Sequence, residues 1–221
     1  MKLPINDRLL ACCSFVRAGE RVADVGCDHG YLGIHLLQGG IAASVIASDL
    51  RPGPLDCARK NAEKFGLSDK ISFFLSDGVQ NIPRDFDVLV CAGMGADTII
   101  SILSAAPWLQ SERYRLILQC QSKTNLLRQY LSDTGWAIGR EAVRRDGRFL
   151  YTVMEVRWDP AAPRLTPGGC YLPPALLENG DDVTREHCAW VYNELKKIVT
   201  SRGEAASEAM KAALTEIEQM K

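Results

Sequence analysis

The sequence has no long hydrophobic run and no closely spaced cysteine pair, and each absence excludes a class of protein. No stretch approaches the roughly 18 consecutive apolar residues of a membrane-spanning helix, so a cytoplasmic protein is expected. The eight cysteines include no Cys-x-x-Cys pair and no Cys/His cluster at metal-ligand spacing, so we expect no bound metal. Cys13, Cys57 and Cys91 stand among apolar residues, and we interpret them as reduced thiols that fill the core.

The composition is that of an ordinary globular protein, and its pattern is an alternation of strands and helices. With 221 residues, of which 47% are hydrophobic and 24% charged, the chain is long enough for one substantial core and an appendage. Apolar runs predict strands at 22–25, 44–49, 71–75, 86–92 and 116–119, with helices at 31–38, 54–65, 96–104 and 123–134 between them. The run 87–92 is apolar on both faces, which is typical of a central parallel strand covered by helices.

The pattern changes near residue 136. Two strand-like runs, 136–143 and 149–158, flank Arg144-Arg145-Asp146-Gly147, whose Asp-Gly pair is a strong hairpin signal. We therefore expect an α/β fold with a seven-stranded, mostly parallel, Rossmann-like sheet that ends in an antiparallel hairpin. This arrangement is typical of class I methyltransferases dependent on S-adenosylmethionine, whereas dinucleotide-binding domains are usually parallel throughout.

The first predicted strand leads into a turn with two glycines and several carboxylates. The run Asp24-Val25-Gly26-Cys27-Asp28-His29-Gly30-Tyr31-Leu32 allows close backbone approach at Gly26 and opens a helix with free N–H groups. Asp28 places a negative charge where the pyrophosphate of a dinucleotide would rest, so the turn does not fit the Gly-x-Gly-x-x-Gly fingerprint. S-adenosylmethionine carries an ammonium and a sulfonium and no phosphate, and it suits an acidic loop. An ordinary strand-to-helix turn is the alternative.

Further candidates follow the next three strands, at the edge of the sheet where ligands gather. Asp49 is placed to accept hydrogen bonds from both ribose hydroxyls, Asp77 to receive the adenine amino group, and Gly78 to leave room for the ring. A tight turn is the alternative reading of each. The predicted cofactor-binding residues are Asp24, Gly26, Cys27, Asp28, Asp49, Leu50, Asp77, Gly78, Ala92 and Gly93.

These motifs carry a family resemblance. Asp24-x-Gly26-x-Asp28-His29-x-Tyr31-Leu32, Asp77-Gly78, Ala92-Gly93-Met94-Gly95, Leu116-Ile117-Leu118-Gln119 and Gly135-Trp136 closely resemble the TrmK family of bacterial tRNA adenine-N1 methyltransferases. The resemblance covers roughly residues 5–157 and implies methyl transfer from S-adenosylmethionine to N1 of adenine 22 in the D-arm of tRNA. Ala96 and Gln119-Cys120-Gln121 depart from the family pattern, in which a glycine and Gln-Pro-Asn are usual.

Methylation of adenine N1 asks mainly for positioning, since the nitrogen has an in-plane lone pair and needs no strong base. Asp28 is the best candidate to accept from the N6 amino group and stabilise the developing cation, although it is equally able to serve the cofactor's ammonium. His29 is a candidate for hydrogen bonding to the base or a phosphate, and Tyr31 for stacking on it. With Met94, where cofactor and substrate should meet, these form the predicted catalytic set; a helix-capping histidine and a core aromatic are the structural alternatives.

Motifs of rival methyl transfers are missing from the sequence. No Pro-Pro-aromatic motif for exocyclic amines and no Pro-Cys for pyrimidines follows the fourth strand. Cys120, after the fifth strand, remains a candidate nucleophile for cytosine methylation. A methyltransferase for a small metabolite and a non-catalytic cofactor- or RNA-binding module are the broader alternatives.

The basic residues gather late in the chain. Residues 113–164 hold ten basic and five acidic residues, against a net charge of −1 for the whole chain. Arg140, Arg144, Arg145 and Arg148 lie on the predicted hairpin, where they are candidates for tRNA phosphate contacts or for a solvated edge.

The last part of the chain is predicted to be a separate helical unit. We expect a catalytic domain at 1–159, a Pro/Gly-rich linker at 160–174 and a two-helix, coiled-coil-like hairpin joined at Gly203 at 175–221. This hairpin either grips tRNA through Arg185, Lys196, Lys197 and Arg202 or braces the domain. A monomer is expected.

Overall fold

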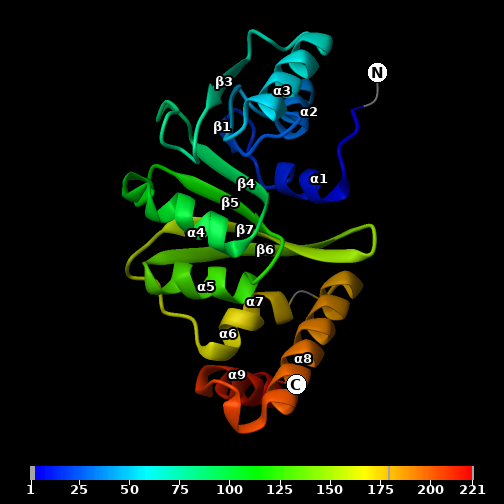
Figure 1. Cartoon of the computed structure of the whole chain (residues 1–221), viewed down its shortest axis with the longest axis vertical. Coiled ribbons are helices and arrows are strands. Elements are labelled where there is room, and N and C mark those ends of the chain that lie inside the picture. The colour runs from blue at the N-terminus through cyan, green and yellow to red at the C-terminus, as the bar shows by residue number, and fades with distance from the viewer. Residues whose placement is uncertain (1–2, 179, 221) are drawn as a thin grey trace.

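The computed structural model describes residues 3–178 and 180–220 and contains one seven-stranded sheet with helices on both faces (Figure 1). The strands are β1 (Arg21–Val25), β2 (Ser44–Asp49), β3 (Ile71–Leu75), β4 (Val88–Met94), β5 (Arg115–Cys120), β6 (Trp136–Asp146) and β7 (Phe149–Trp158). The helices are α1 (Asp7–Cys13), α2 (Tyr31–Gln38), α3 (Pro52–Lys64), α4 (Ala96–Ser104), α5 (Thr124–Asp133), α6 (Pro167–Tyr171), α7 (Pro174–Leu177), α8 (Asp182–Arg202) and α9 (Glu208–Gln219). Two 3₁₀ turns, η1 (Pro107–Leu109) and η2 (Gly203–Ala205), complete them.

The strands lie in the order β3-β2-β1-β4-β5-β7-β6. The first five strands along the chain are parallel to one another, whereas β7 is antiparallel to both β5 and β6. The predicted parallel sheet with an antiparallel end is therefore confirmed. The chain moves outward from β1 in one direction through β2 and β3, and in the other through β4 and β5. This switch point, at the carboxyl ends of β1 and β4, is where such sheets bind ligands.

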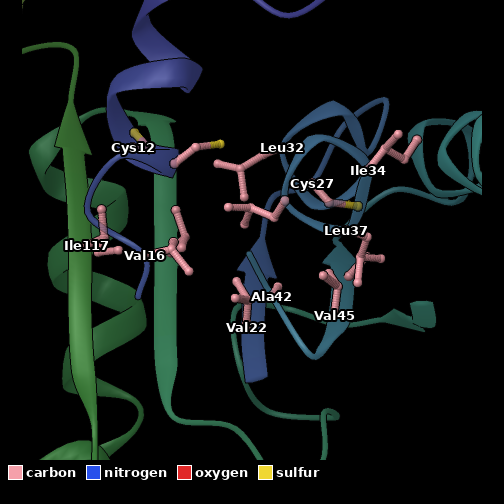
Figure 2. Close-up of a cluster of buried hydrophobic side chains, with 14 of the residues drawn as sticks. Cys12, Val16, Val22, Cys27, Leu32, Ile34, Leu37, Ala42, Val45 and Ile117 are labelled. Atoms are coloured by element: carbon pink, nitrogen blue, oxygen red, sulfur yellow. The ribbon is translucent and has the colours of Figure 1, made fainter. Parts of the chain in front are cut away.

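Each face of the sheet has its own hydrophobic core, because side chains alternate along a strand. On β4, Val88 and Val90 face the core under α1, α2 and α3, whereas Leu89 and Cys91 face the core under α4 and α5. Figure 2 shows the first of these cores, in which Cys12 of α1 and α2 side chains such as Leu32 meet apolar side chains of the strands. Both faces are covered, which accounts for the apolar sequence of the central strands.

The cysteine predictions hold with one exception. Cys13 and Cys91 are buried, and the eight cysteines are all free thiols. Cys57 is exposed, so its prediction as a core residue is wrong. On α3 the buried positions are Leu55, Ala58 and Ala62, and Cys57 lies two residues from Leu55, on another face of the helix.

The C-terminal helices form a unit that is packed on the sheet. α8 and α9 meet at Gly203, as predicted, and run antiparallel, since Tyr192 Oη donates to Glu218 Oε1 across a distance of 2.9 Å. Their core includes Leu195, Ala213 and Ile217 together with Val143 of β6. The segment 160–174, predicted as a linker, contains α6, which packs against α5 and α9.

A buried arginine holds this unit in place. Arg128 of α5 pairs with Glu141 of β6 at 2.9 Å, and its Nη1 donates to the carbonyl oxygens of Cys170 and Tyr171 at 3.0 Å each. The side chains of Arg128 and Glu141 are each 2% exposed. Because every one of these partners is buried or fixed in backbone, α6 has a defined position against the sheet.

Candidate functional site

The turn between β1 and α2 has a backbone that is fixed by glycines and by β2. Gly26 and Gly30 have φ angles of +73°, and Asp28 has a φ of +48°. The backbone N–H groups of Gly26 and Cys27 both donate to the Ser48 carbonyl, at 2.8 and 2.9 Å. The positive φ of Gly26 favours glycine at this position, and a Cβ atom there would lie 2.4 Å from Met94 Cε, so Met94 would have to move.

Two buried carboxylates, Asp24 and Asp49, lie beside this turn and differ in their hydrogen-bond partners. Asp49 accepts hydrogen bonds from the backbone N–H groups of Asp28 and Arg51, at 3.2 and 3.0 Å. Asp24 is 3% exposed, and no group of the described chain donates a hydrogen bond to its Oδ2. Burial, reinforced by the negative charge of Asp49, raises the pKa of Asp24 to about 7. The site therefore contains one carboxylate held by two backbone donors and one with an oxygen, Oδ2, that lacks a partner.

Two cavities meet at these residues. One, of about 350 Å³, lies against α1 and is lined by Asp24 and by the turn up to Asp28. The other, of about 460 Å³, lies against α4 and is lined by Leu50, Asp77 and Gly78. Gly26, Asp49 and Met94 line both. All ten predicted cofactor-binding residues therefore line one cavity or the other at the carboxyl ends of β1 to β4.

These residues fit S-adenosylmethionine. The unpartnered Oδ2 of Asp24 is a place for a cationic or hydroxyl donor, and Asp49 has its carboxylate held toward the cavities by two backbone donors. The glycine at position 26 keeps the turn free of a side chain where the two cavities join. The carboxylates disfavour a diphosphate, as the sequence predicts.

Asp28, His29 and Tyr31 form an accessible cluster beside the first cavity. The side chains of Asp28 and His29 are 63% and 49% exposed, and Asp28 Oδ2 lies 3.7 Å from His29 Nε2. The His29 and Tyr31 rings are stacked, with centroids 5.5 Å apart. Asp28 lines the cavity, whereas His29 and Tyr31 do not. The structure thus brings Asp28, His29 and Tyr31 together, and Met94 lines the same cavity as Asp28.

Sequence reasoning missed the part of the cavity wall that α1 forms. Arg8 of α1 donates from Nη1 to Gln119 Oε1 at 2.7 Å, and the same oxygen accepts from the Gly93 backbone N–H at 2.9 Å. Arg8 and Leu9 line the first cavity. α1 itself was not predicted, although Asn6 caps it by accepting from the Leu9 backbone N–H, a signal that the sequence carries.

Neither Ala96 nor Cys120, at the two departures from the family pattern, lines the two cavities. Ala96 is fully buried in the core under α4 and lines neither cavity. Cys120 is buried and donates from Sγ to the Ser122 carbonyl at 2.9 Å, and burial raises the pKa of its thiol. A thiol in this state is a poor nucleophile, which weighs against cytosine methylation at this site.

The four hairpin arginines do not form a single patch. Arg140 lies over the Phe15 ring at 4.2 Å, on the side of α1. Arg145 points to the other side and pairs with Glu186 of α8. Arg144 donates to the carbonyl of Val143 at 2.7 Å, and Arg148 lies over the Phe149 ring at 4.9 Å, near the hairpin turn. The four arginines are therefore exposed and distributed over both faces of the hairpin.

The described helices include none that is long and apolar enough to cross a membrane.

Arg185 and Lys196, two of the basic residues predicted to grip tRNA, form ion pairs within the C-terminal unit, with Asp182 and Glu218 respectively.

The fold, the acidic turn and the paired cavities define a methyltransferase domain. Residues 5–154 match the family model described as a methyltransferase domain. The chain is 30% identical to the tRNA (adenine(22)-N(1))-methyltransferase of Bacillus subtilis over 69% of this chain and 65% of that one. The crystal structure of the B. subtilis m1A22 tRNA methyltransferase TrmK is 26% identical, covers 99% of this chain and 96% of its own, and has a TM-score of 0.82.

A further structure is that of Streptococcus pneumoniae Sp1610, a tRNA (m1A22) methyltransferase by name, in complex with S-adenosyl-L-methionine. It is 28% identical, covers 97% of this chain and 98% of its own, and has a TM-score of 0.84. By contrast, a ribosomal protein L11 methylase from Lactobacillus delbrueckii covers 68% of this chain, with a TM-score of 0.56. The chain therefore belongs to the methyltransferase-domain family and, within it, to the TrmK family.

Proposed function

We propose that the protein is an S-adenosylmethionine-dependent methyltransferase that methylates N1 of adenine 22 in tRNA. The observation that carries this proposal is the extent of the match. TrmK structures cover 97–99% of the chain, including the C-terminal helices, whereas the L11 methylase covers 68%. The C-terminal unit is thus shared with the tRNA enzymes, which favours them over methyltransferases that share only the sheet.

The cofactor assignment uses the two cavities. S-adenosylmethionine supplies an electrophilic methyl group on its sulfonium when it is bound. We assign Asp49 to the ribose hydroxyls, since two backbone donors fix its carboxylate. Asp77 and Gly78 line the cavity against α4 and are assigned to the adenine ring, and Asp24, with its unpartnered oxygen, to the ammonium. Met94 lies between the two cavities.

The exposed cluster is assigned to the substrate. Asp28 is accessible and lines the cavity, so it is placed to accept a hydrogen bond from an adenine N6 amino group and to stabilise the cation that forms at N1. The stacked rings of His29 and Tyr31 lie beside it and offer a flat surface to the base. The lone pair of N1 attacks without a base, so alignment by these side chains is the principal contribution of the protein.

The test is direct. Purified protein is incubated with unmodified bulk tRNA and methyl-labelled S-adenosylmethionine, and the tRNA is digested to nucleosides. Labelled 1-methyladenosine is the expected product, and mapping by primer extension should place it at position 22. If the protein binds the cofactor and no tRNA is labelled, the proposal is wrong, and a small-metabolite methyltransferase or a binding module takes its place.

We further propose a cytoplasmic monomer without a metal, organised as a catalytic domain (1–159), a connecting segment (160–174) and a C-terminal unit (175–221). Within the described residues, no group of three His, Cys, Asp or Glu side chains is placed to hold a metal ion. Light scattering should give the mass of one chain, 24.3 kDa, and a chelator should leave activity unchanged. A dimer mass, or loss of activity that a metal restores, contradicts this proposal.

A further inference from the structure

A cavity separate from the two described above lies between the catalytic domain and the C-terminal unit. This α8 groove, of about 210 Å³, is bounded by the end of β5, the start of α5, β7 and α8. Its walls include the aromatic side chains of Tyr151 on β7, Tyr171 on α6 and Trp190 on α8. Trp190 is 59% exposed, so part of its ring is accessible from solvent.

The groove also contains a buried polar atom without a partner. His187 lines it and is 7% exposed, and no group of the described chain hydrogen-bonds to its Nδ1. Burial, with a smaller contribution from the positive charge of Arg128, lowers the pKa of His187 to about 4, so the ring is neutral at physiological pH. A neutral ring nitrogen in such a position calls for a polar ligand with a matching donor or acceptor.

The charges of the groove favour a base over a phosphate. Arg128 is paired with Glu141 and donates to two carbonyl oxygens, and Lys123 pairs with Asp97 at 2.7 Å. Glu194 also lines the groove, and its carboxylate repels a phosphate but accepts from an amino group. Aromatic faces with a few polar groups are the means by which proteins hold an unstacked base.

The α8 groove is close to the cavity that lies against α1 and is lined by Asp24 and Asp28. Arg8, which lines that cavity, lies 5.9 Å from the centre of the Tyr151 ring, and it bonds to Gln119, the residue before Cys120 of the groove. Phe149, which is 52% exposed, lies 6.1 Å from Tyr151 and continues the aromatic surface toward the hairpin turn. The α8 groove and the cavity against α1 therefore lie close enough for one bound RNA to contact both.

We propose that the α8 groove holds an unpaired nucleobase of the tRNA substrate, stacked on Trp190 and hydrogen-bonded by His187. The inference rests on the proposed function and specifies it further. The C-terminal unit then takes part in substrate binding, and it positions the RNA strand so that the target adenine reaches the cavity beside Asp28.

The first experiment compares Trp190→Ala, Trp190→Phe and Met220→Ala. Met220 is an exposed apolar residue of the same unit that lies outside the groove, so it is a matched control. Trp190→Ala should weaken binding of unmodified tRNA at least about fivefold, the low end of the effect of losing one stacked base, and Trp190→Phe should retain most of the affinity. Calorimetry should give an unchanged affinity for S-adenosylmethionine in all three variants.

The second readout is tryptophan fluorescence. The other tryptophans are buried or half-buried, so a base on Trp190 should quench the wild type more than Trp190→Phe. Single-stranded oligoadenylate should quench it, whereas the same strand annealed to oligouridylate should not. Equal quenching by both, or Trp190→Ala binding and methylating tRNA like the wild type, overturns the inference while the proposed function stands. If the wild type methylates no tRNA, the proposed function fails and the inference with it.

Discussion

The buried carboxyl of Asp24 makes stability depend on pH. Its pKa is raised from 3.8 to about 7, so between these values the folded protein holds a proton that the unfolded chain has lost. The free energy of unfolding should therefore fall as pH rises from about 4 to about 7. Asp24→Asn removes the ionisable group. The change that it causes in the free energy of unfolding should be more favourable at pH 8 than at pH 4, by up to roughly 4 kcal/mol.

Urea unfolding of both proteins at pH 4 and pH 8 measures this difference, and calorimetry measures cofactor affinity. We expect Asp24→Asn to bind S-adenosylmethionine more weakly, because the ammonium loses its carboxylate. If the stability difference between the two proteins is the same at both pH values, the pKa of Asp24 is not raised in the folded protein.

Asp28 allows a test in which the backbone is kept constant. Its φ of +48° is tolerated by Asn and strained for Ala, so Asp28→Asn removes the charge while preserving the turn. We expect kcat to fall by about two orders of magnitude with an unchanged KM for S-adenosylmethionine, since the lost contact is to the adenine. Steady-state kinetics with tRNA measure both. A raised KM for S-adenosylmethionine with little change in kcat would instead assign Asp28 to the cofactor's ammonium.

The sequence predicted one side of the site better than the other. Asp24, Gly26, Asp49 and Gly78 lie at or just after the carboxyl ends of β1, β2 and β3, and a parallel sheet brings such positions together whatever the details of packing. The contact between Arg8 and Gln119 spans 111 positions and depends on where α1 packs across the sheet. No local pattern specifies that distance, so this wall of the cavity appears only in the folded chain.

At the level of the elements, α6 depends on one side chain. Arg128→Ala leaves Glu141 buried without its partner and removes the donor to two carbonyl groups. We expect a loss of about 3–5 kcal/mol in the free energy of unfolding, measured by urea denaturation. Arg164→Ala is the matched control, because Arg164 is 74% exposed and pairs with Asp133 at 3.8 Å, so its loss should cost less than about 1 kcal/mol. Equal losses would mean that Arg128 does not anchor α6.

The elements themselves were largely predictable, and the exceptions have a common cause. The alternation of apolar strands with amphipathic helices predicted β1 to β5 along the chain, and the Asp-Gly pair predicted the turn between β6 and β7. α1 and α6 have seven and five residues, too few for a helical period to be recognised beside prolines and glycines. Both are stabilised by tertiary contacts, which a local pattern does not record.

For the molecule as a whole, RNA affinity has to come from local charge, because the net charge is −1. Arg144 and Arg145 lie on opposite faces of the hairpin and are both exposed. If each neutralises a phosphate, Arg144→Ala with Arg145→Ala should weaken tRNA binding and lower the slope of log affinity against log salt by about two. Arg84→Ala with Arg113→Ala, at the amino ends of β4 and β5, is the control with the same loss of charge and should leave the slope unchanged. Binding titrations over a range of salt concentrations measure the slope for both double variants. If the two slopes are equal, the hairpin arginines do not contact the RNA.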